Sequence, residues 1–270
     1  MYCIRLIILF LLSVSLSFAQ DAQICHIANT GFFVSNGESS VLMDALYADG
    51  MDGDPVASGV VNSNMENAKG RFSNVDLIFA SHIHEDHMKA KPILRHLRAN
   101  DNAKAILPAQ AAIFMRAAGI GNENERIHYA DLKPGEVRAL DGYDMPVTLY
   151  GLSHGAGNED ITNIGIKIEV NGKTIMHVGD MYGPQAGFGP QNKITVDYLM
   201  IPFWYLYRPE RVEYIQSIFN VQNIIPMHFA LDSSEWMQSM GGLKSVKERT
   251  YSSTDNIITL DQEMMCIPIK

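Results

Sequence analysis

The chain has 270 residues, of which 47% are hydrophobic and 19% are charged, so it has enough apolar side chains for a well-packed globular domain. Its formal net charge is −9 at pH 7. That charge disfavours nucleic acid as a partner, because phosphate binding needs a basic surface. It does not exclude a small anionic substrate, because a bound divalent metal makes its own site locally positive.

The N-terminal segment is typical of a secretory signal. Arg5 precedes the apolar block "LIILFLLSVSLSF", and small residues up to Ala19 are suited to cleavage after that residue. We expect residues 1–19 to be a signal peptide and residues 20–270 to form one domain, secreted or periplasmic. A membrane anchor is the alternative, but the block is shorter than the ~20 residues that cross a bilayer. No stable membrane span is expected after cleavage.

The cysteines neither predict a zinc site nor decide a disulfide. Cys3 would leave with the signal, and no C-x-x-C spacing is present. Cys25 and Cys266 can pair in an oxidising compartment, but two cysteines at opposite ends of a chain can equally stay free.

Strand-like and helix-like runs alternate along the remainder, and no internal repeat or linker divides it. Predicted strands lie at residues 30–44 (two strands joined at Asn36-Gly37), 146–153, 163–180 (two strands joined at Asn171-Gly172) and 223–229. Predicted helices, with apolar residues at helical spacing, lie at residues 89–100, 108–120 and 209–219.

Four separate apolar runs each end in a side chain that can bind a metal. "VDLIFAS", "VTLYGLS", "KTIMHVG" and "NIIPM" lead into His82, His154, Asp180 and His228. The carboxyl ends of strands are where α/β proteins assemble their sites, because the sheet fixes the position and the following loop stays free for chemistry. We therefore expect these side chains to meet.

The stretch "SHIHEDH" concentrates three imidazoles and two carboxylates directly behind the first of these runs. His82 and His84 are two residues apart, so an extended backbone points both rings to one side. If the chain then turns helical, His87 lies on the face of His84. Imidazole and carboxylate are ligands that zinc accepts. The alternative is a set of unrelated polar residues, or a loop with one adventitious metal.

These motifs together resemble those of the metallo-β-lactamase superfamily over nearly the whole mature sequence. "HIHEDH" matches the H-x-H-x-D-H motif, "GLSHG" the next histidine, "HVGD" the bridging aspartate and "PMHF" the last histidine. "SNGESSVLMDA" is similar to the first hairpin of the family, which ends in an aspartate, here Asp44. The resemblance implies an α+β fold, an αββα four-layer sandwich in which two mixed β-sheets are flanked by helices.

The resemblance also implies a dinuclear site at one edge of the sandwich. It assigns His82, His84 and His154 to the first metal, Asp86, His87 and His228 to the second, and Asp180 to a bridge between them. The implied cofactors are two Zn²⁺ ions, with Mn²⁺ or Fe²⁺ as other candidates, and the implied catalytic residues are Asp86 and Asp180. Two metals ~3.5–4 Å apart share a water and lower its pKa, so that a bridging hydroxide can attack a small-molecule substrate.

An aspartate at position 180 resembles the lactonase, thioesterase and phosphodiesterase branches, whereas β-lactamases of this superfamily usually have a cysteine or a neutral residue there. We therefore expect a secreted dinuclear zinc hydrolase that acts on a lactone, an ester or a related small molecule. The alternatives are a phosphodiesterase or β-lactamase-like amide hydrolase on the same site, a di-iron redox protein, and a binding protein without activity. The sequence leaves the substrate, the native metal and the oligomeric state open.

Two loops are candidates for the substrate pocket. "MYGPQAGFGP" (181–190) follows Asp180, and "PFWYLYRP" (202–209) concentrates the side chains Phe203, Trp204, Tyr205, Tyr207 and Arg208. Aromatic rings with a nearby cation suit an apolar or anionic substrate, and a tyrosine hydroxyl can donate to an oxyanion. The alternative for the second loop is ordinary packing under the following helix. His96, in the Arg-rich run "ILRHLR", is expected to be solvated, and His177 to have a structural role.

Overall fold

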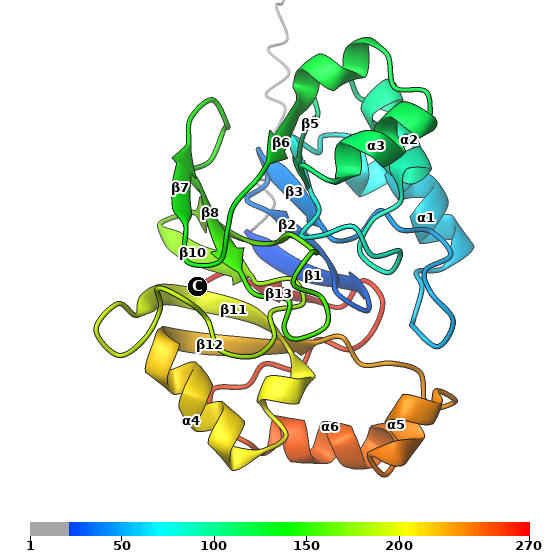
Figure 1. The fold of residues 1–270 in the computed structure, drawn as a ribbon. Coiled ribbons are helices and arrows are strands. Elements are labelled where there is room, and N and C mark those ends of the chain that lie inside the picture. The colour runs from blue at the N-terminus through cyan, green and yellow to red at the C-terminus, as the bar shows by residue number, and fades with distance from the viewer. Residues whose placement is uncertain (1–21) are drawn as a thin grey trace, which may run out of the picture.

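The computed structural model describes residues 22–270, and the predicted signal segment 1–19 lies outside the described residues. The chain forms two mixed β-sheets packed face to face (Figure 1). The first sheet has the strand order β13 (Cys266–Pro268), β1 (Gln23–Ala28), β2 (Gly31–Ser35), β3 (Ser40–Met43), β4 (Leu77–Phe79), β5 (Lys104–Pro108), β6 (Ile127–Ala130). The second has the order β12 (Phe219–Met227), β11 (Ile194–Pro202), β10 (Lys173–His177), β9 (Asn163–Val170), β8 (Val147–Leu152), β7 (Val137–Leu140).

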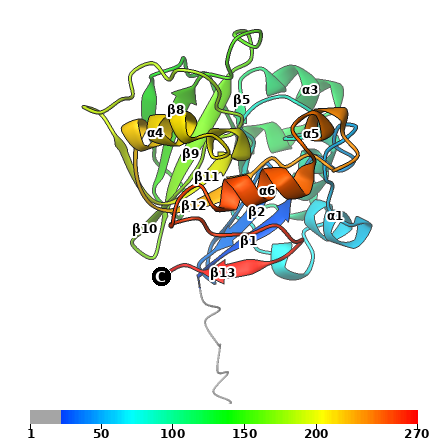
Figure 2. The ribbon, with the colours of Figure 1, turned by 90° about the horizontal axis from the view of Figure 1, so that it is seen from below.

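Helices cover the outer face of each sheet, which completes four layers and confirms the predicted αββα sandwich. Against the first sheet lie α1 (Gly59–Glu66), α2 (Ala90–Ala99) and α3 (Ala111–Ala117), with the 3₁₀ turns η1 (Gly70–Phe72) and η2 (Asn122–Arg126). Against the second lie η3 (Phe203–Tyr205), α4 (Pro209–Ile218), α5 (Glu235–Ser239) and α6 (Leu243–Tyr251), which Figure 2 shows from their own side. Among the described residues, no helix combines the length and the apolar composition that crossing a bilayer requires.

The strands of the first sheet are apolar at nearly every position because both of their faces are covered. Successive side chains of a strand point to opposite faces. In β3, Val41 and Met43 face the second sheet, while Leu42 packs under the helices. The same alternation holds in β2, where Phe32 and Phe33 belong to the two different cores.

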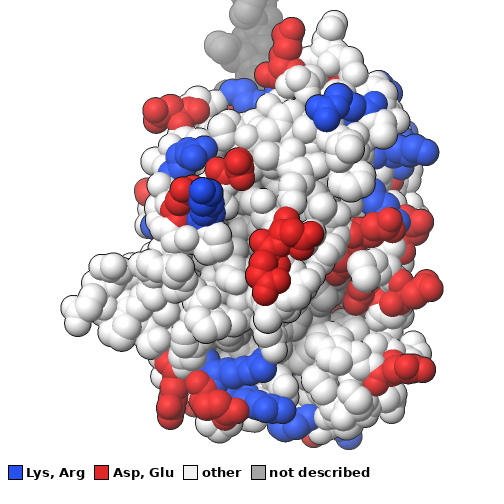
Figure 3. All heavy atoms as spheres, in the orientation of Figure 1, with Lys and Arg blue, Asp and Glu red and all other residues white. Residues whose placement is uncertain are grey.

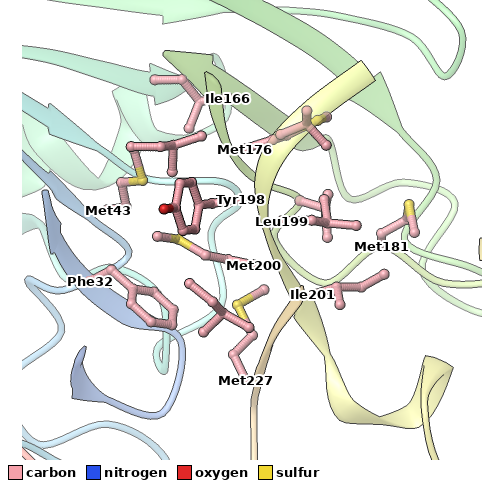
Figure 4. Packing of buried hydrophobic residues seen from close by; sticks show 14 of the residues in the cluster. Phe32, Met43, Ile166, Met176, Met181, Tyr198, Leu199, Met200, Ile201 and Met227 are labelled. Atoms are coloured by element: carbon pink, nitrogen blue, oxygen red, sulfur yellow. The ribbon is translucent and has the colours of Figure 1, made fainter. Parts of the chain in front are cut away.

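The core between the sheets holds the two halves of the molecule at a fixed separation. Figure 4 shows Phe32 and Met43 of the first sheet among Met176, Tyr198 and Met200 of the second. Long, flexible methionine side chains suit this irregular space between two twisted sheets. Any site built from both sheets therefore rests on a dense interior that resists deformation.

The local predictions hold with few exceptions. The 30–44 hairpin forms β2 and β3, residues 89–100 contain α2, and residues 209–219 contain α4 beginning at Pro209. The prediction for His96 is wrong: its side chain is buried, and its Nδ1 meets the carbonyl oxygen of Met65. His96 follows Ile93 by three residues, and so it lies on the apolar face of α2 despite its arginine neighbours.

A disulfide closes the first sheet at its edge. Cys25 of β1 and Cys266 of β13 are directly opposed in the antiparallel register and are bonded to each other. The bridge joins positions 241 residues apart. It therefore ties the short C-terminal strand to the N-terminal one and constrains most of the unfolded chain.

Reducing this bridge is expected to lower the free energy of unfolding by about 2–5 kcal/mol, because it releases a very long loop in the unfolded state. The measurement is guanidinium unfolding of the chain from Gln20 onward, with and without reductant. Cys266→Ser is the control: it should match the reduced protein and show no response to reductant. Equal stability with and without reductant in the parent chain would contradict the expectation.

Candidate metal centre

The predicted donors come together at one edge of the sandwich, where four strands end. His82 follows β4 of the first sheet, and His154, Asp180 and His228 follow β8, β10 and β12 of the second. The three strands of the second sheet run in the same direction, because β8 and β10 are each antiparallel to β9 and β10 and β12 are each parallel to β11. Their carboxyl ends therefore share one edge.

Seven side chains form two adjacent groups whose ligand atoms lie within 4.8 Å of one another in each group. The first group is His82, His84 and His154, and the second is Asp86, His87, Asp180 and His228. These are the seven residues that the sequence singled out, with Asp180, the predicted bridge, in the second group. That each group binds a metal stays a prediction, and the geometry gives it a direct test.

The spacing between donors fits a metal of zinc's size. Metal–ligand distances of about 2.0–2.2 Å in a tetrahedron place neighbouring donors about 3.3–3.6 Å apart. His82 Nε2 and His84 Nδ1 are 3.1 Å apart. Asp86 Oδ2 lies 3.4 Å from His87 Nε2 and 3.2 Å from His228 Nε2. A small relaxation outward would admit an ion in each group.

Asp180 lies between the groups. Its Oδ1 is 3.1 Å from His87 Nε2, and its Oδ2 is 3.1 Å from His228 Nε2 and 3.9 Å from His82 Nε2. One oxygen thus faces donors of both groups. This placement is the one that a bridging carboxylate needs.

Several polar atoms of the two groups are buried without a hydrogen-bond partner among the described residues. They are His87 Nε2, both ring nitrogens of His154, Asp180 Oδ1 and His228 Nδ1. Buried polar atoms without a partner are rare and costly in folded proteins. A cation in each group would satisfy His87 Nε2, Asp180 Oδ1 and one ring nitrogen of His154, so the residues present fit a metal.

The charges of the second group point the same way. Burial acts to lower the pKa of His87, but the carboxylates of Asp180, Asp86 and Asp44 outweigh it and raise that pKa well above the usual value. The same balance holds for His228. Burial acts to lower its pKa, but the carboxylates of Asp180 and Asp86 outweigh burial and raise that pKa to about 10. The two buried carboxylates therefore attract positive charge into this group. Bound metal ions would supply this positive charge and would leave the imidazoles neutral.

In the first group, burial is the largest effect on His82 and lowers its pKa well below the usual value. The neighbouring imidazole of His87 lowers that pKa further. Burial also lowers the pKa of His84, and the neighbouring His154 acts in the same direction. Neutral imidazoles have the free lone pair that coordination requires. His82 and His84 therefore present uncharged nitrogen donors in the first group, and the second group presents the anionic ones.

Asp44 orients the loop of donors from beneath. Its Oδ1 accepts a 2.7 Å hydrogen bond from the Ser81 backbone N–H, and its Oδ2 accepts from Ser81 Oγ and His87 Nδ1, each at 2.6 Å. A hydrogen on His87 Nδ1 leaves Nε2 as the free donor toward the metal side. Asp44 is fully buried at a positive φ of 44°, a conformation that aspartate and asparagine adopt more readily than other non-glycine residues.

Asn163 and Gly179 place Asp180. Asn163 Oδ1 accepts from the backbone N–H of Asp180 at 3.1 Å, and its Nδ2 donates to the carbonyl of Val178. Gly179 has a φ of +56°, and a Cβ on it would come within 2.6 Å of Ser81 Cβ. The sequence did not predict the roles of Ser81, Asn163 and Asn29. The Nδ2 of Asn29 donates to Asp86 Oδ2 at 3.3 Å. Their signal was weak, since each is an uncharged polar residue at or near the end of a strand and belongs to no spacing pattern of its own.

A cavity of about 430 Å³ opens over the donors. It is lined by His154, Ala156, Asn158, Asp180, Tyr182, Trp204, Tyr207, Arg211, Trp236 and Met240. This size is in the range of pockets that hold small organic ligands. Aromatic rings dominate its wall.

The two candidate loops contribute unequally to that wall. From 181–190 only Tyr182 lines the cavity, while Gln185 is buried beneath and ties the loop to Ser153. From 202–209, Trp204 and Tyr207 line the cavity. Phe203 and Tyr205 pack instead into the core, where Phe203 stacks on Phe229. Ordinary packing is thus confirmed for part of this loop, while Trp204 and Tyr207 line the cavity and their contact with a substrate stays a prediction.

Comparisons with known proteins agree with this geometry. The Beta-lactamase superfamily domain matches residues 41–237. A UPF0173 metal-dependent hydrolase from Pelotomaculum thermopropionicum is 23% identical over 253 residues, which cover 90% of this chain and 99% of that protein.

Solved structures show the same fold at low identity. Igni18, a metallo hydrolase from Ignicoccus hospitalis, superposes with a TM-score of 0.56 at 15% identity, over 93% of this chain and 99% of that one. A diiron β-hydroxylase from Streptomyces venezuelae, CmlA, superposes with a TM-score of 0.55 at 11% identity, over 93% of this chain and 54% of that one. The fold is thus shared by proteins of different chemistry.

Asp44→Asn is expected to weaken metal binding by roughly 10- to 100-fold, because an amide cannot accept from all three donors that now meet the carboxylate. The measurement is competition for zinc with a chromogenic chelator. Asp197→Asn is the matched control: Asp197 Oδ2 accepts from the N–H and Oγ of Thr174, each at 2.8 Å, on strands of the second sheet. That variant should lose stability alone, and an equal loss of zinc affinity in both would show that Asp44 has no special role.

Proposed function

Because the chain belongs to the Beta-lactamase superfamily, we propose that it is a secreted hydrolase that holds two zinc ions and cleaves a lactone or a related ester. The observation that carries the proposal is the convergence of seven donors into two groups with Asp180 between them. The relative from Pelotomaculum thermopropionicum, named a metal-dependent hydrolase, supports the reaction class.

When bound, the two ions would supply a Lewis acid and a water of lowered pKa. His82, His84 and His154 would hold one ion, and Asp86, His87 and His228 the other, with Asp180 shared. Hydrolysis adds water across the acyl C–O bond and yields a carboxylic acid and an alcohol, so it needs no oxidant or reductant. No nucleophilic side chain is required.

Tyr182 is placed to assist at the carbonyl oxygen of the substrate. Its Oη accepts from Arg211 Nη2 at 3.3 Å, so its own hydrogen is available to an acceptor in the cavity that it shares with His154 and Asp180. A hydroxyl that donates to the oxygen on which charge develops stabilises the transition state. A substrate bound against the aromatic wall would displace water from the same space, which would strengthen that interaction.

A di-iron redox protein is the second candidate. Imidazole and carboxylate donors also suit iron, and the diiron β-hydroxylase from Streptomyces venezuelae shares the fold. That protein is longer, since the shared region is 54% of it. Metal analysis of protein purified without added metal separates the two candidates: zinc supports hydrolysis, and iron with a visible absorption band supports redox chemistry.

Asp180→Ala is expected to lower hydrolysis by more than the roughly 10- to 100-fold typical of losing an outer ligand-orienting group, because it removes a donor from both metals. Bound zinc should fall below two ions per chain. The measurements are metal content and turnover of lactone, ester, thioester, phosphodiester and β-lactam substrates, with and without chelator.

Glu85→Gln is the control for that variant. Glu85 stands between the donors in sequence but is exposed and pairs with Lys89 at 3.2 Å. It should retain both zinc and turnover. Absence of turnover on every substrate at full metal occupancy would refute the proposed hydrolase.

The mature protein is expected to begin at Gln20, outside the cytoplasm. Arg5 and the apolar block behind it support export, and the Cys25–Cys266 bridge suits an oxidising compartment. The measurement is the intact mass of the protein in periplasmic and culture fractions of an expressing bacterium. Retention of residues 1–19 in a cytoplasmic fraction would contradict export.

A further inference from the structure

The cavity over the donors contains one cationic side chain among aromatic ones. We propose that Arg211 binds a carboxylate of the substrate, so that the preferred substrate is an ester or lactone with a flat apolar body and a carboxylate. The inference rests on the proposed hydrolase function and adds the substrate class to it. It stands on the charge balance of Arg211, on its hydrogen bonds and on the rings around it.

The guanidinium of Arg211 has no acidic partner. Within residues 22–270, no Asp or Glu oxygen lies within 4.0 Å of its nitrogens. Arg95 and Arg98 pair with Glu66 and Glu123, respectively. The chain has 30 acidic against 21 basic side chains, so acids are not scarce. Figure 3 shows acidic side chains interspersed with basic ones on the face in view. Arg126 and Arg249, like Arg211, donate to backbone carbonyl oxygens and not to acids, so what distinguishes Arg211 is its place in the wall of the cavity, where a ligand can reach it.

The hydrogen bonds of Arg211 fix its direction and leave capacity. Nη1 donates to the carbonyl oxygen of Trp204 at 2.9 Å, and Nη2 donates to Tyr182 Oη at 3.3 Å. Both acceptors are neutral, and a guanidinium has five N–H donors. The remaining donors form a planar fork of the kind that binds a carboxylate through two parallel hydrogen bonds.

Aromatic rings surround this cation and the approach to the donors. Arg211 lies 5.5 Å from the ring centroid of Tyr182 and 5.9 Å from that of Tyr207. Trp204 is anchored by a 3.2 Å hydrogen bond from its Nε1 to the carbonyl of Met181. Tyr182 and Trp236 are 42% and 43% exposed, a large apolar area to leave facing solvent. A flat apolar group bound between these rings would cover it.

The two tryptophans of the chain, Trp204 and Trp236, both line the cavity. Intrinsic fluorescence therefore reports binding at this place. The first experiment titrates zinc-loaded protein with phenylacetate and with phenylacetamide, which differ in charge and little in shape. We expect the carboxylate to bind roughly tenfold more tightly or better, as a charge-assisted hydrogen-bond pair implies.

Variants assign that preference to one residue. Arg211→Gln is expected to abolish it, and Arg211→Lys, which keeps the charge but loses the fork, to retain part of it. Arg208→Gln is the matched control: Arg208 stands 5.2 Å over the ring of Tyr207 but does not line the cavity. Its preference should be unchanged. An equal loss in the Arg208 and Arg211 variants would overturn the proposal, since it would show only a general charge effect.

Chelation separates Arg211 from the metals as the carboxylate's partner. The preference for phenylacetate should persist in chelated protein. If it disappears with the metal while Arg211→Gln leaves it intact, the carboxylate binds the metals and the proposal is wrong.

Turnover separates this proposal from the proposed function. The substrates are 4-acetoxyphenylacetate and 4-acetoxyphenylacetamide, and we expect a lower KM for the first, by about the factor seen in binding. Arg211→Gln should bring the two KM values together. Hydrolysis of both esters with equal KM in the parent protein would overturn the carboxylate site and leave the hydrolase intact. Hydrolysis of neither, with the fluorescence preference retained, would refute the hydrolase alone.

Discussion

The structure around the site depends on one electrostatic constraint. The buried carboxylates of Asp86 and Asp180 both lie beside the imidazole of His228, and they need positive charge between them. Burying a carboxylate without compensation is costly. His87 and His228 compensate by holding protons more firmly, and metal ions would compensate better, because they also satisfy one orphaned nitrogen of His154. Asp44, Asn163 and Gly179 are best understood as the supports that keep this arrangement from relaxing apart.

Both sheets are needed to build the site. The loop with His82 continues from β4 of the first sheet, whereas His154, Asp180 and His228 end strands of the second. The distance between the two sets is therefore set by the packing between the sheets, where Phe32 and Met43 meet Met176 and Met200 (Figure 4). The fold contributes to the site through this fixed separation as much as through the ligands themselves.

The sequence predicts the donors well because they follow strands directly, and a strand end carries a periodic apolar signal that a single residue does not. It also predicts the hairpin at Asn36-Gly37 and the helix that begins at Pro209, since both have strong local signals. It fails where tertiary contact decides. His96 looks solvated between arginines but lies on the face of α2 that contacts Met65. The partner of Cys25 depends on β13, a three-residue strand that only the folded sheet defines.

The loops that shape the cavity follow a different logic from the strands that hold the donors. Ala156 and Asn158 come from the loop after β8, Tyr182 from the loop after β10, Trp204 to Arg211 from the stretch that runs from η3 into α4, and Trp236 from α5, so four separate segments beyond the sheet edge form the wall. Several of these segments are tied to the core by side chains on their inner side, such as Ile215 of α4 and Met237 of α5. Phe203 and Tyr205 likewise anchor the 202–209 segment in the core and so hold Trp204 beside His228, at 5.0 Å between ring centroids. A ring held beside the donors and a cation farther along the wall restrict orientation as well as identity, so a substrate held by Arg211, as proposed, would approach the seven donors in one direction.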